Sequence, residues 1–565
     1  MIEDIYEPLI RYRDEFKQKF AQIAEKTFEK LSADSKVDIE ENRKTVFMMN
    51  SVEQEKSELE NKRALLSFLR FVLIAAVICS AGFCVYKLFL SEDGFDKNHI
   101  LAATVVFAVS LPLAFWVSPK IKQLDAKITE LRSKAAQLKR TAWEQMAPLN
   151  KLFTWDLLPR MMSECVPKLE FDPFFCCGRI DELRNSFGWN DSFNSDISIL
   201  FAHSGSINGN PFAVCKFRRQ VWGTAVYTGT KVISYTELVR DSNGKLRRET
   251  RYQTLVATVE KPKPEYVDQS AVIYGNDAAA DLSFSREPSE YSGKDGFFSN
   301  LGKKGELKKL EKFARNLEDD SDFTMMSNKE FEVLFHADDR DDEVQFRILF
   351  TPLAQQQMVK LLNDKEHGYG DDFSFIKQQK INLVHAEHLD ATDIDTDPKQ
   401  FRNYSYDLMK EFFITRTNDY FKAVYFAFAP LLTIPLYQQT RSFQDIYGSF
   451  DTKNVSFWET ESFVNYIGGK KFAHPESKTT NILKATDCHL ENGGTVYVTA
   501  HGFKTVERLE LVPVFGNDNR WHNVPVEWLE YIPVRRTNEI SIGVTDRDNA
   551  AQDTEKIRRQ LYIRR

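Results

Sequence analysis

Two apolar segments separated by a short polar turn decide the fold of this chain. The first reads Phe71-Val-Leu-Ile-Ala-Ala-Val-Ile-Cys-Ser-Ala-Gly-Phe-Cys-Val-Tyr86, with Arg70 and Lys87 at its edges, and the second covers residues 100–117 without a charge. A hydrocarbon core about 30 Å thick requires about 20 apolar residues in a helix. The second segment comes close to that length, and the first reaches it when Lys87 snorkels and residues 88–90 are included. We therefore predict a transmembrane hairpin.

Lysines and arginines in the flanks orient this hairpin, which we place at residues 67–119 with spans at about 68–90 and 99–118. They precede the first span and follow the second, at Lys56, Lys62, Arg63, Arg70, Lys120, Lys122, Lys127, Arg132 and Lys134, whereas the turn at 91–98 holds one lysine and three acids. Because cytoplasmic flanks carry an excess of Lys and Arg, we expect a multi-pass protein of the cell (inner) membrane. Its N- and C-termini would be cytoplasmic.

Length and composition predict several packed domains and no nucleic-acid partner. The chain has 565 residues and 13% aromatics, including 44 Phe, which favours globular structure over disorder. Its net charge of −7 lacks the basic footprint of nucleic-acid binding. The seven cysteines show no zinc spacing, which suits thiols packed in a reducing compartment. For the vicinal pair Cys176-Cys177 we favour ordinary burial over redox activity.

Helices flank the predicted hairpin on both sides. Residues 1–66 and 120–150 are expected to form amphipathic and coiled-coil helices, because apolar side chains recur there at spacings of three and four. The clearest seam is Ile121, Leu124, Ile128, Leu131, Ala135, Leu138 and Ala142, and the weaker one is Met49, Val52, Leu59 and Leu66. We expect an antiparallel stalk, and we favour packing within one chain over homo-oligomerisation through this stalk.

The remaining chain is expected to form mixed α+β cytoplasmic domains. We place a first β-rich part at 151–272, a linker with a charged helix (307–317) at 273–325, a second α+β part at 326–440, a C-terminal α+β domain at 441–545 and a charged tail at 546–565. Strands are predicted at 196–202, 211–217, 230–238, 252–259, 331–335, 344–351, near 381–385, and at 495–500, 508–514 and 530–534. A helix is predicted at 352–362. An Asn-Gly turn at 243–244 predicts a hairpin between the third and fourth strands.

The segment 420–437 is a further apolar stretch with a different expected role. About fifteen residues after Lys422 carry no charge, but Pro430 and Pro435 interrupt them. A stretch of this length is short for a membrane span and typical of a core helix or an interfacial piece. We favour the protein core, with a membrane-surface segment and then a third span as the alternatives.

No constellation of residues identifies a reaction. The chain has no phosphate-binding loop, no nucleophile elbow and no HExxH motif. His385, His388 and Asp390 are a conceivable metal cluster, although a strand would place the two histidines on opposite faces. Residues 393–397 have the opening rhythm of a calcium loop, but Pro398 replaces its glycine and Tyr404 its final glutamate. We therefore assign no catalytic, metal or cofactor residues.

Three pieces of the chain resemble a known family. They are the early hairpin, residues 331–335 (Phe-Glu-Val-Leu-Phe) and residues 341–352, which end in Phe-Thr-Pro. These are similar to an uncharacterised family of bacterial two-span membrane proteins, a domain of unknown function often met beside LemA-type proteins. In that family a strand, a turn, a strand and an "LTP" helix follow the hairpin. Here Phe350 stands in the Leu position, and the chain continues beyond the similar region of about 45–400. The resemblance implies a bacterial membrane protein and no assigned activity.

The leading functional hypothesis is a non-enzymatic scaffold. It is a bacterial integral membrane protein that anchors cytoplasmic domains for binding a protein partner, with a LemA-type protein as one candidate. One alternative is a membrane-anchored metal-dependent hydrolase using His385, His388 and Asp390. The other is an accessory subunit of a transport complex, although spans with no charge between their ends give a conduction path little to line it.

Overall fold

The protein divides into two compact units. The computed structural model describes residues 5–89, 97–190, 196–240, 246–293, 305–310, 312, 324–441, 454–489, 494–544 and 561–564. Unit 1 comprises Met1–Ala24, Thr154–Asp397 and Arg416–Arg565, and unit 2 comprises Glu25–Phe153 and Pro398–Thr415. The described chain mixes helices and strands, which confirms the predicted α+β class.

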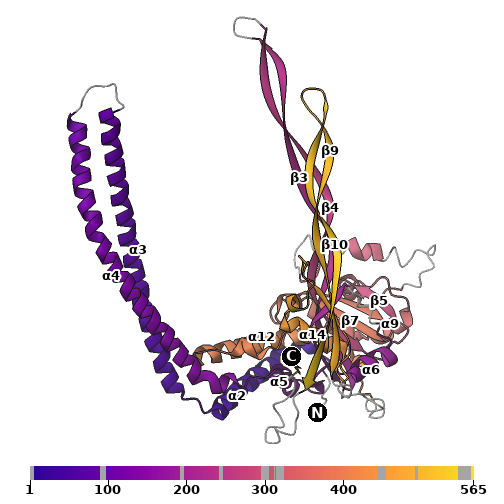
Figure 1. Cartoon of the computed structure of the whole chain (residues 1–565). Helices are drawn as coiled ribbons and strands as arrows, with labels where there is room; N and C mark the ends of the chain where they lie inside the picture. Colours follow the sequence, from indigo (N-terminus) through magenta and orange to yellow (C-terminus); the bar gives the residue numbers. More distant parts are fainter. Residues whose placement is uncertain are drawn as a thin grey trace. The chain divides into compact units, whose positions relative to one another are not determined.

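Two long helices dominate unit 2. Helix α3 (Ile39–Phe89) runs without a break from a polar part into an apolar part, and helix α4 (Lys97–Asn150) runs from an apolar part into a polar one. The two helices lie side by side (Figure 1). Both are long and apolar enough to cross a membrane. Their apolar parts are mostly exposed, as at Phe71 and Phe115, whereas a soluble core helix would bury such side chains.

The predicted seams lie at the interface between α3 and α4. Ile121, Ile128, Ala135 and Ala142 are buried on α4, as are Met49 and Val52 on α3, and the other seam leucines are half-buried. Arg63 Nε lies 2.6 Å from Asp125 Oδ1 across the interface. This ion pair is half-exposed and contributes about 0–1 kcal/mol, so apolar burial supplies most of the stability.

Unit 1 is built on two antiparallel sheets. The first has the order β1 (Leu169–Phe171), β2 (Ile197–Ile207), β3 (Asn210–Arg240), β4 (Leu246–Gly275), β7 (Ile381–Ala386), β6 (Phe373–Gln378) and β5 (Ser283–Arg286). The second has the order β11 (Leu561–Arg564), β10 (Trp521–Val544), β9 (Thr495–Phe515) and β8 (Ile482–Ala485). Trp458 is fully buried in a core formed with residues of β2, β3 and β4.

The remaining helical segments belong to both units. They are α1 (Pro8–Arg11), η1 (Tyr12–Phe16), α2 (Lys17–Ser35), α5 (Leu157–Cys165), α6 (Cys177–Phe187), α8 (Lys329–Phe335), α9 (Glu343–Leu349), α10 (Pro352–Leu362), α11 (Glu387–Ala391), η2 (Pro398–Phe401), α12 (Tyr406–Leu432), η3 (Pro435–Gln438), α14 (Phe457–Gly468) and η4 (Gly469–Lys471). The helix predicted at 352–362 is confirmed as α10.

Two predicted strands are wrong, because residues 331–335 lie in helix α8 and residues 344–349 of the predicted strand 344–351 lie in helix α9. The side chain of Asn328 caps α8 by accepting the Phe331 N–H at 3.1 Å, and Asp342 caps α9 by accepting the Gln345 N–H at 2.9 Å. Phenylalanines four residues apart then share one helical face and pack together. The strand–turn–strand part of the family resemblance therefore has a helical form here.

Four predicted strands merge in pairs into two longer ones. Residues 211–217 and 230–238 belong to the single strand β3, and 495–500 and 508–514 belong to β9. The predicted hairpin is confirmed by the pairing of Arg240 with Leu246, although its turn at 241–245 lies outside the described residues. Strand β5 occupies part of the predicted linker. Most of the predicted helix at 307–317, the turn at 90–96 and the tail at 545–560 also lie outside the described residues.

The apolar segment 420–437 lies in the core of unit 1, as we favoured. It forms the end of α12 and the short helix η3, and most of its residues are buried. Phe20 stacks on Phe421 with ring centroids 4.2 Å apart, and Tyr12 stacks on Tyr425 at 5.4 Å. The first amphipathic helix therefore covers this segment with aromatic side chains.

Candidate functional site

The most distinctive surface of unit 1 is a pair of long β-hairpins. We call it the arm, and it consists of residues 220–240 and 246–268 of β3 and β4 with residues 502–515 and 521–534 of β9 and β10. Among the described strands, β2 pairs with β3 only as far as Arg219, and β7 pairs with β4 only from Val272. Beyond these points β3 and β4 pair, among the strands that the structure describes, only with each other, and this two-stranded part extends for about 65–70 Å at 3.3 Å per residue. Figure 1 shows the two hairpins twisted around one another.

The inner faces of the two hairpins form a core of their own. Ile233, Leu255 and Ala257 pack against Val524 and Val526. The backbone approaches so closely that a Cβ on Gly229 would lie 2.0 Å from the carbonyl oxygen of Pro525. Polar contacts at the rim add Lys261 Nζ to Glu510 Oε2 at 2.6 Å and Lys231 Nζ to the Asn523 carbonyl at 3.1 Å. The arm is therefore a β-structure of two layers. Each layer stabilises the other, because an isolated two-stranded hairpin is only marginally stable in water.

The outer face of the β3–β4 hairpin is exposed and almost uncharged. Cross-strand partners share a face, and the register pairs Thr228 with Thr258 and Thr230 with Val256. Between residues 224–236 and 250–262 the side chains on this face, which we call the outer face, are Thr224, Val226, Thr228, Thr230, Val232, Ser234, Thr236, Thr250, Tyr252, Thr254, Val256, Thr258, Glu260 and Pro262. All fourteen are exposed, and Glu260 is the one charged side chain among them. Nearer the turn, the same side of the hairpin carries Leu238, Arg240, Leu246 and Arg248.

The outer face of the β9–β10 hairpin carries a second apolar patch. Leu509 and Leu511 are exposed on β9, and the exposed rings of Phe515 and Trp521 meet edge to face at 5.4 Å beside the turn. Leu509 pairs across the hairpin with Glu527, so this patch is less uniformly neutral. Contiguous exposed apolar surface of this kind marks interaction sites in soluble domains.

The strand edges of the arm are a second binding feature. An unpaired edge presents a row of backbone N–H and C=O groups that can pair with another strand, and proteins usually blunt such edges with charge. Arg240, Arg247, Arg248 and Arg251 gather near the end of the β3–β4 hairpin, and Arg251 pairs with Glu237 at 3.0 Å. In the long section below this basic end, Glu260 is the one charged side chain on the outer face. The arm is thus suited to binding a protein partner that presents a β-strand or a flat β-sheet.

The two histidines of the conceivable metal cluster lie on different elements. His385 is in β7 and His388 is in α11. His388 Nδ1 contacts the Asp372 carboxylate and its Nε2 lies 2.9 Å from the Ala423 carbonyl, while Tyr369 stacks on the ring at 3.8 Å. Both nitrogens therefore already face protein oxygen atoms.

His385 is engaged in the same way. Its Nδ1 faces the Ser270 carbonyl, and its Nε2 lies 3.5 Å from Asp390 Oδ2. Within the described residues no group of three His, Cys, Asp or Glu side chains is arranged to hold a metal ion. In the segment 393–397, Asp393 and Asp395 accept backbone N–H groups two residues on, which is ordinary turn geometry.

The vicinal cysteines Cys176 and Cys177 are not joined by a disulfide. All seven cysteines are reduced thiols. Cys176 is buried, and burial raises the pKa of its thiol to about 11. Because the thiolate is the reactive form, this raised pKa favours the burial interpretation over the redox one.

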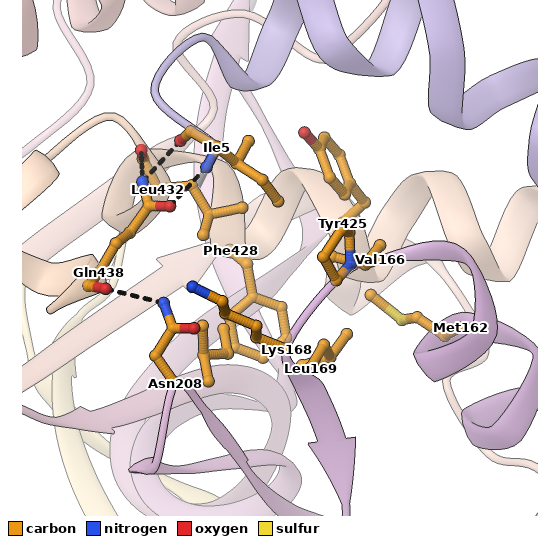
Figure 2. Close-up of a pocket in the computed structure, with 12 residues that line it drawn as sticks. Ile5, Met162, Val166, Lys168, Leu169, Asn208, Tyr425, Phe428, Leu432 and Gln438 are labelled. Carbon is orange, nitrogen blue, oxygen red and sulfur yellow. Dashed lines mark hydrogen bonds between the residues drawn. The ribbon is translucent and has the colours of Figure 1, made fainter. Parts of the chain in front are cut away.

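Unit 1 also contains a small cavity beside the N-terminal segment. Figure 2 shows this cavity, which measures about 10 Å³. Gln438 bonds there to the backbone of Ile5 and Leu432, and Asn208 donates to the Gln438 carbonyl. That volume holds about one water molecule, so the contacts fasten the N-terminal segment instead of binding a ligand.

A larger cleft of about 340 Å³ lies at the base of the arm. Asp196, His501 and Arg535 line it with Gln220, Ile482, Gly502, Phe503, Pro533 and Val534. Burial, with Arg535 and Lys484 nearby, lowers the pKa of His501 and keeps its imidazole neutral at pH 7. The lining has no hydroxyl, thiol or amine that could act as a nucleophile, so it provides a polar recess without an evident reaction.

Comparison with protein-family models, curated proteins and solved structures gives no match. The surface itself must therefore carry the functional argument. The only sign of the arm in the sequence is the alternation of Thr and Val residues. Any strand that is buried on one face shows the same alternation, so this pattern does not identify an exposed arm.

Proposed function

We propose that this chain is a non-enzymatic membrane scaffold that binds a protein partner through the arm. Helices α3 and α4 would form the transmembrane hairpin and continue as a coiled-coil stalk, with both termini in the cytoplasm. The basic flanks and the seam residues support this arrangement. The single observation that carries the binding function is the exposed, nearly uncharged outer face of β3–β4.

The composition of the outer face makes its burial by a partner favourable. Thr and Val are β-branched residues suited to packing against another sheet. A face without like charges meets no electrostatic penalty when a neutral surface covers it, and burial of its valine and tyrosine side chains stabilises the complex. The metal-hydrolase alternative has no comparable support, because His385 and His388 contact protein atoms.

Charge substitution on this face tests the proposal. Val232 (64% exposed) and Val256 (53%) are diagonal neighbours on the outer face, so Val232→Glu with Val256→Glu places two charges in the contact. The matched control is Val344→Glu with Ile348→Glu on α9, where the exposed fractions are 68% and 54%.

The two variants are compared by chemical cross-linking in native membranes followed by mass spectrometry of the cross-linked partners. We expect the arm variant to lose its cross-links to the partner by about tenfold or more, while the α9 variant keeps them. Equal partner yields from both variants would contradict the proposed binding surface.

A further inference from the structure

A groove opens between α3 and α4 where their apolar parts end. It is lined by Lys62, Leu65 and Leu66 of α3 and by Lys120, Gln123, Leu124 and Lys127 of α4, and it measures about 530 Å³. Lys120 follows the last apolar residues of the second segment by three positions, and Leu66 precedes the first segment. The groove therefore lies at the level where a bilayer would change from acyl chains to headgroups.

The charge around the groove is strongly positive. Between residues 62–70 and 118–127 there are six cations and one acid, namely Lys62, Arg63, Arg70, Lys120, Lys122 and Lys127 against Asp125. Asp125 is already paired with Arg63 at 2.6 Å. In the described part of the chain neither Lys62 nor Lys127 makes an ion pair, so their charges are available to an anion.

The floor and the neighbourhood of the groove are apolar. Leu65 is exposed, and Leu66 and Leu124 are half-buried. Lys120 Nζ lies 3.3 Å from the centroid of the Trp116 ring, which is itself exposed, as is Phe115. Tryptophan at this depth is typical of an interfacial anchor. Leu65 and Leu66 lie between Lys62 and the first apolar segment, an order that fits a ligand with an anionic end and an apolar end.

We propose that this groove binds an anionic phospholipid. Lys62, Lys120 and Lys127 would hold its phosphate, and the three leucines would contact its glycerol and the start of its acyl chains. Basic pockets between helices on the cytoplasmic side of a membrane bind such headgroups. The inference rests on the membrane anchoring proposed above and adds a lipid specificity to it.

The test uses the full chain in nanodiscs of phosphatidylcholine with about 20% phosphatidylglycerol, an anionic lipid of the class in question. After extraction into mild detergent, native mass spectrometry counts the phosphatidylglycerol that stays bound. The groove variant combines Lys62→Gln, Lys120→Gln and Lys127→Gln. The control removes the same charge from α3 and α4 away from the groove, by Lys44→Gln, Lys134→Gln and Lys139→Gln.

We expect the wild type and the control to retain phosphatidylglycerol in preference to phosphatidylcholine. The amount of phosphatidylglycerol bound to the groove variant should be about tenfold lower. Equal retention by the groove variant, or no preference in the wild type, would overturn the proposal. Displacement of the bound lipid by millimolar inorganic phosphate would do so too, because it would show a site for a free anion. Alkaline carbonate extraction separates the lipid site from the membrane anchoring on which it rests. If the chain resists extraction but shows no lipid preference, only the lipid site is refuted.

Discussion

Arg286 shows how unit 1 accommodates buried charge. Its side chain is 0% exposed and its guanidinium Nη2 lies 2.6 Å from Asp371 Oδ1, a carboxylate that is 2% exposed. The same guanidinium donates to the carbonyls of Phe373, Leu334 and Phe335. Burial nevertheless lowers the pKa of Arg286, so the Asp371 charge is needed to keep this cation in the core.

Asp371→Asn should therefore be severely destabilising. It leaves the Arg286 cation buried without a counter-charge, which costs about 3–5 kcal/mol. Thermal unfolding of the purified protein measures the effect, and Glu237→Gln is the control because its pair with Arg251 is exposed and contributes about 0–1 kcal/mol. Similar changes in both variants would show that the buried pair has no special role.

Lys377 makes the stability of unit 1 depend on pH. It is buried in β6, and burial lowers the pKa of its amine from 10.5 to about 7. Between pH 7 and about 10 the unfolded chain binds more protons at this side chain than the folded chain does. This group's contribution to stability therefore rises with pH across that window, by at most about 1.4 kcal/mol per pH unit.

Lys377→Met removes this dependence. We expect the difference in unfolding free energy between wild type and variant to shift in favour of the wild type as the pH rises from 7.5 to 9.5. Denaturant titrations at several pH values measure that difference, in which other titrating groups cancel. A constant difference would show that the folded-state pKa of Lys377 is ordinary.

Individual seam residues on α4 could be predicted from the sequence, but the exposed residues of the arm could not. Ile121, Ile128 and Ala135 repeat at heptad spacing, and the neighbouring helix α3 is close in sequence. The inner face of the arm is covered by Val524 and Val526, about 270–300 residues after the strand they cover. A contact that distant leaves no local pattern to show which face stays open.

At the scale of elements, Gly229 should keep the two hairpins together. A side chain there would meet the Pro525 backbone, and overpacking of this kind costs about 1–3 kcal/mol. We expect Gly229→Val to raise hydrogen exchange in residues 505–530, as the inner faces separate. Thr228→Val, on the outer face of the same strand, should leave the exchange unchanged, and equal protection in both variants would argue against the two-layered arm.

Element types were predictable where a pattern was long. The helices α3 and α4 follow periods sustained over many turns, whereas α8 and α9 have seven residues each and were mistaken for strands. Their caps Asn328 and Asp342 were visible in the sequence, but short apolar runs suit both states. The full length of β3 was missed because Gly223 and Gly229 interrupt its β-propensity, while pairing with β4 continues through them.

At the scale of the whole molecule, the hairpin should decide where the protein resides. Replacing residues 68–118 by a short Gly-Ser linker removes both apolar segments and leaves the heptad seam of α4 from Ile121 onward. We expect the wild type to remain in the pellet after alkaline carbonate extraction and the deletion variant to appear in the soluble fraction. A deletion variant that stays in the pellet without aggregating would locate the membrane attachment elsewhere.

The apolar helices could be predicted from the sequence, but the arm could not. The paired apolar helices followed directly from composition, because a membrane-spanning helix must satisfy its backbone internally and cover itself with apolar side chains. The arm arises from two hairpins that join different sheets of unit 1. Its existence depends on their mutual packing, which neither hairpin encodes alone.

Site-specific photo-cross-linking tests the central claim most directly. A photoreactive amino acid is placed at Thr228, Thr230 or Thr258 on the outer face of the arm, or at exposed Val344 and Ile348 on α9, in otherwise unchanged full-length protein in native membranes. We expect one common cross-linked protein from the three arm positions and none from α9. Arm positions that yield no cross-link, or the same products as α9, would contradict a scaffold that binds its partner through the arm.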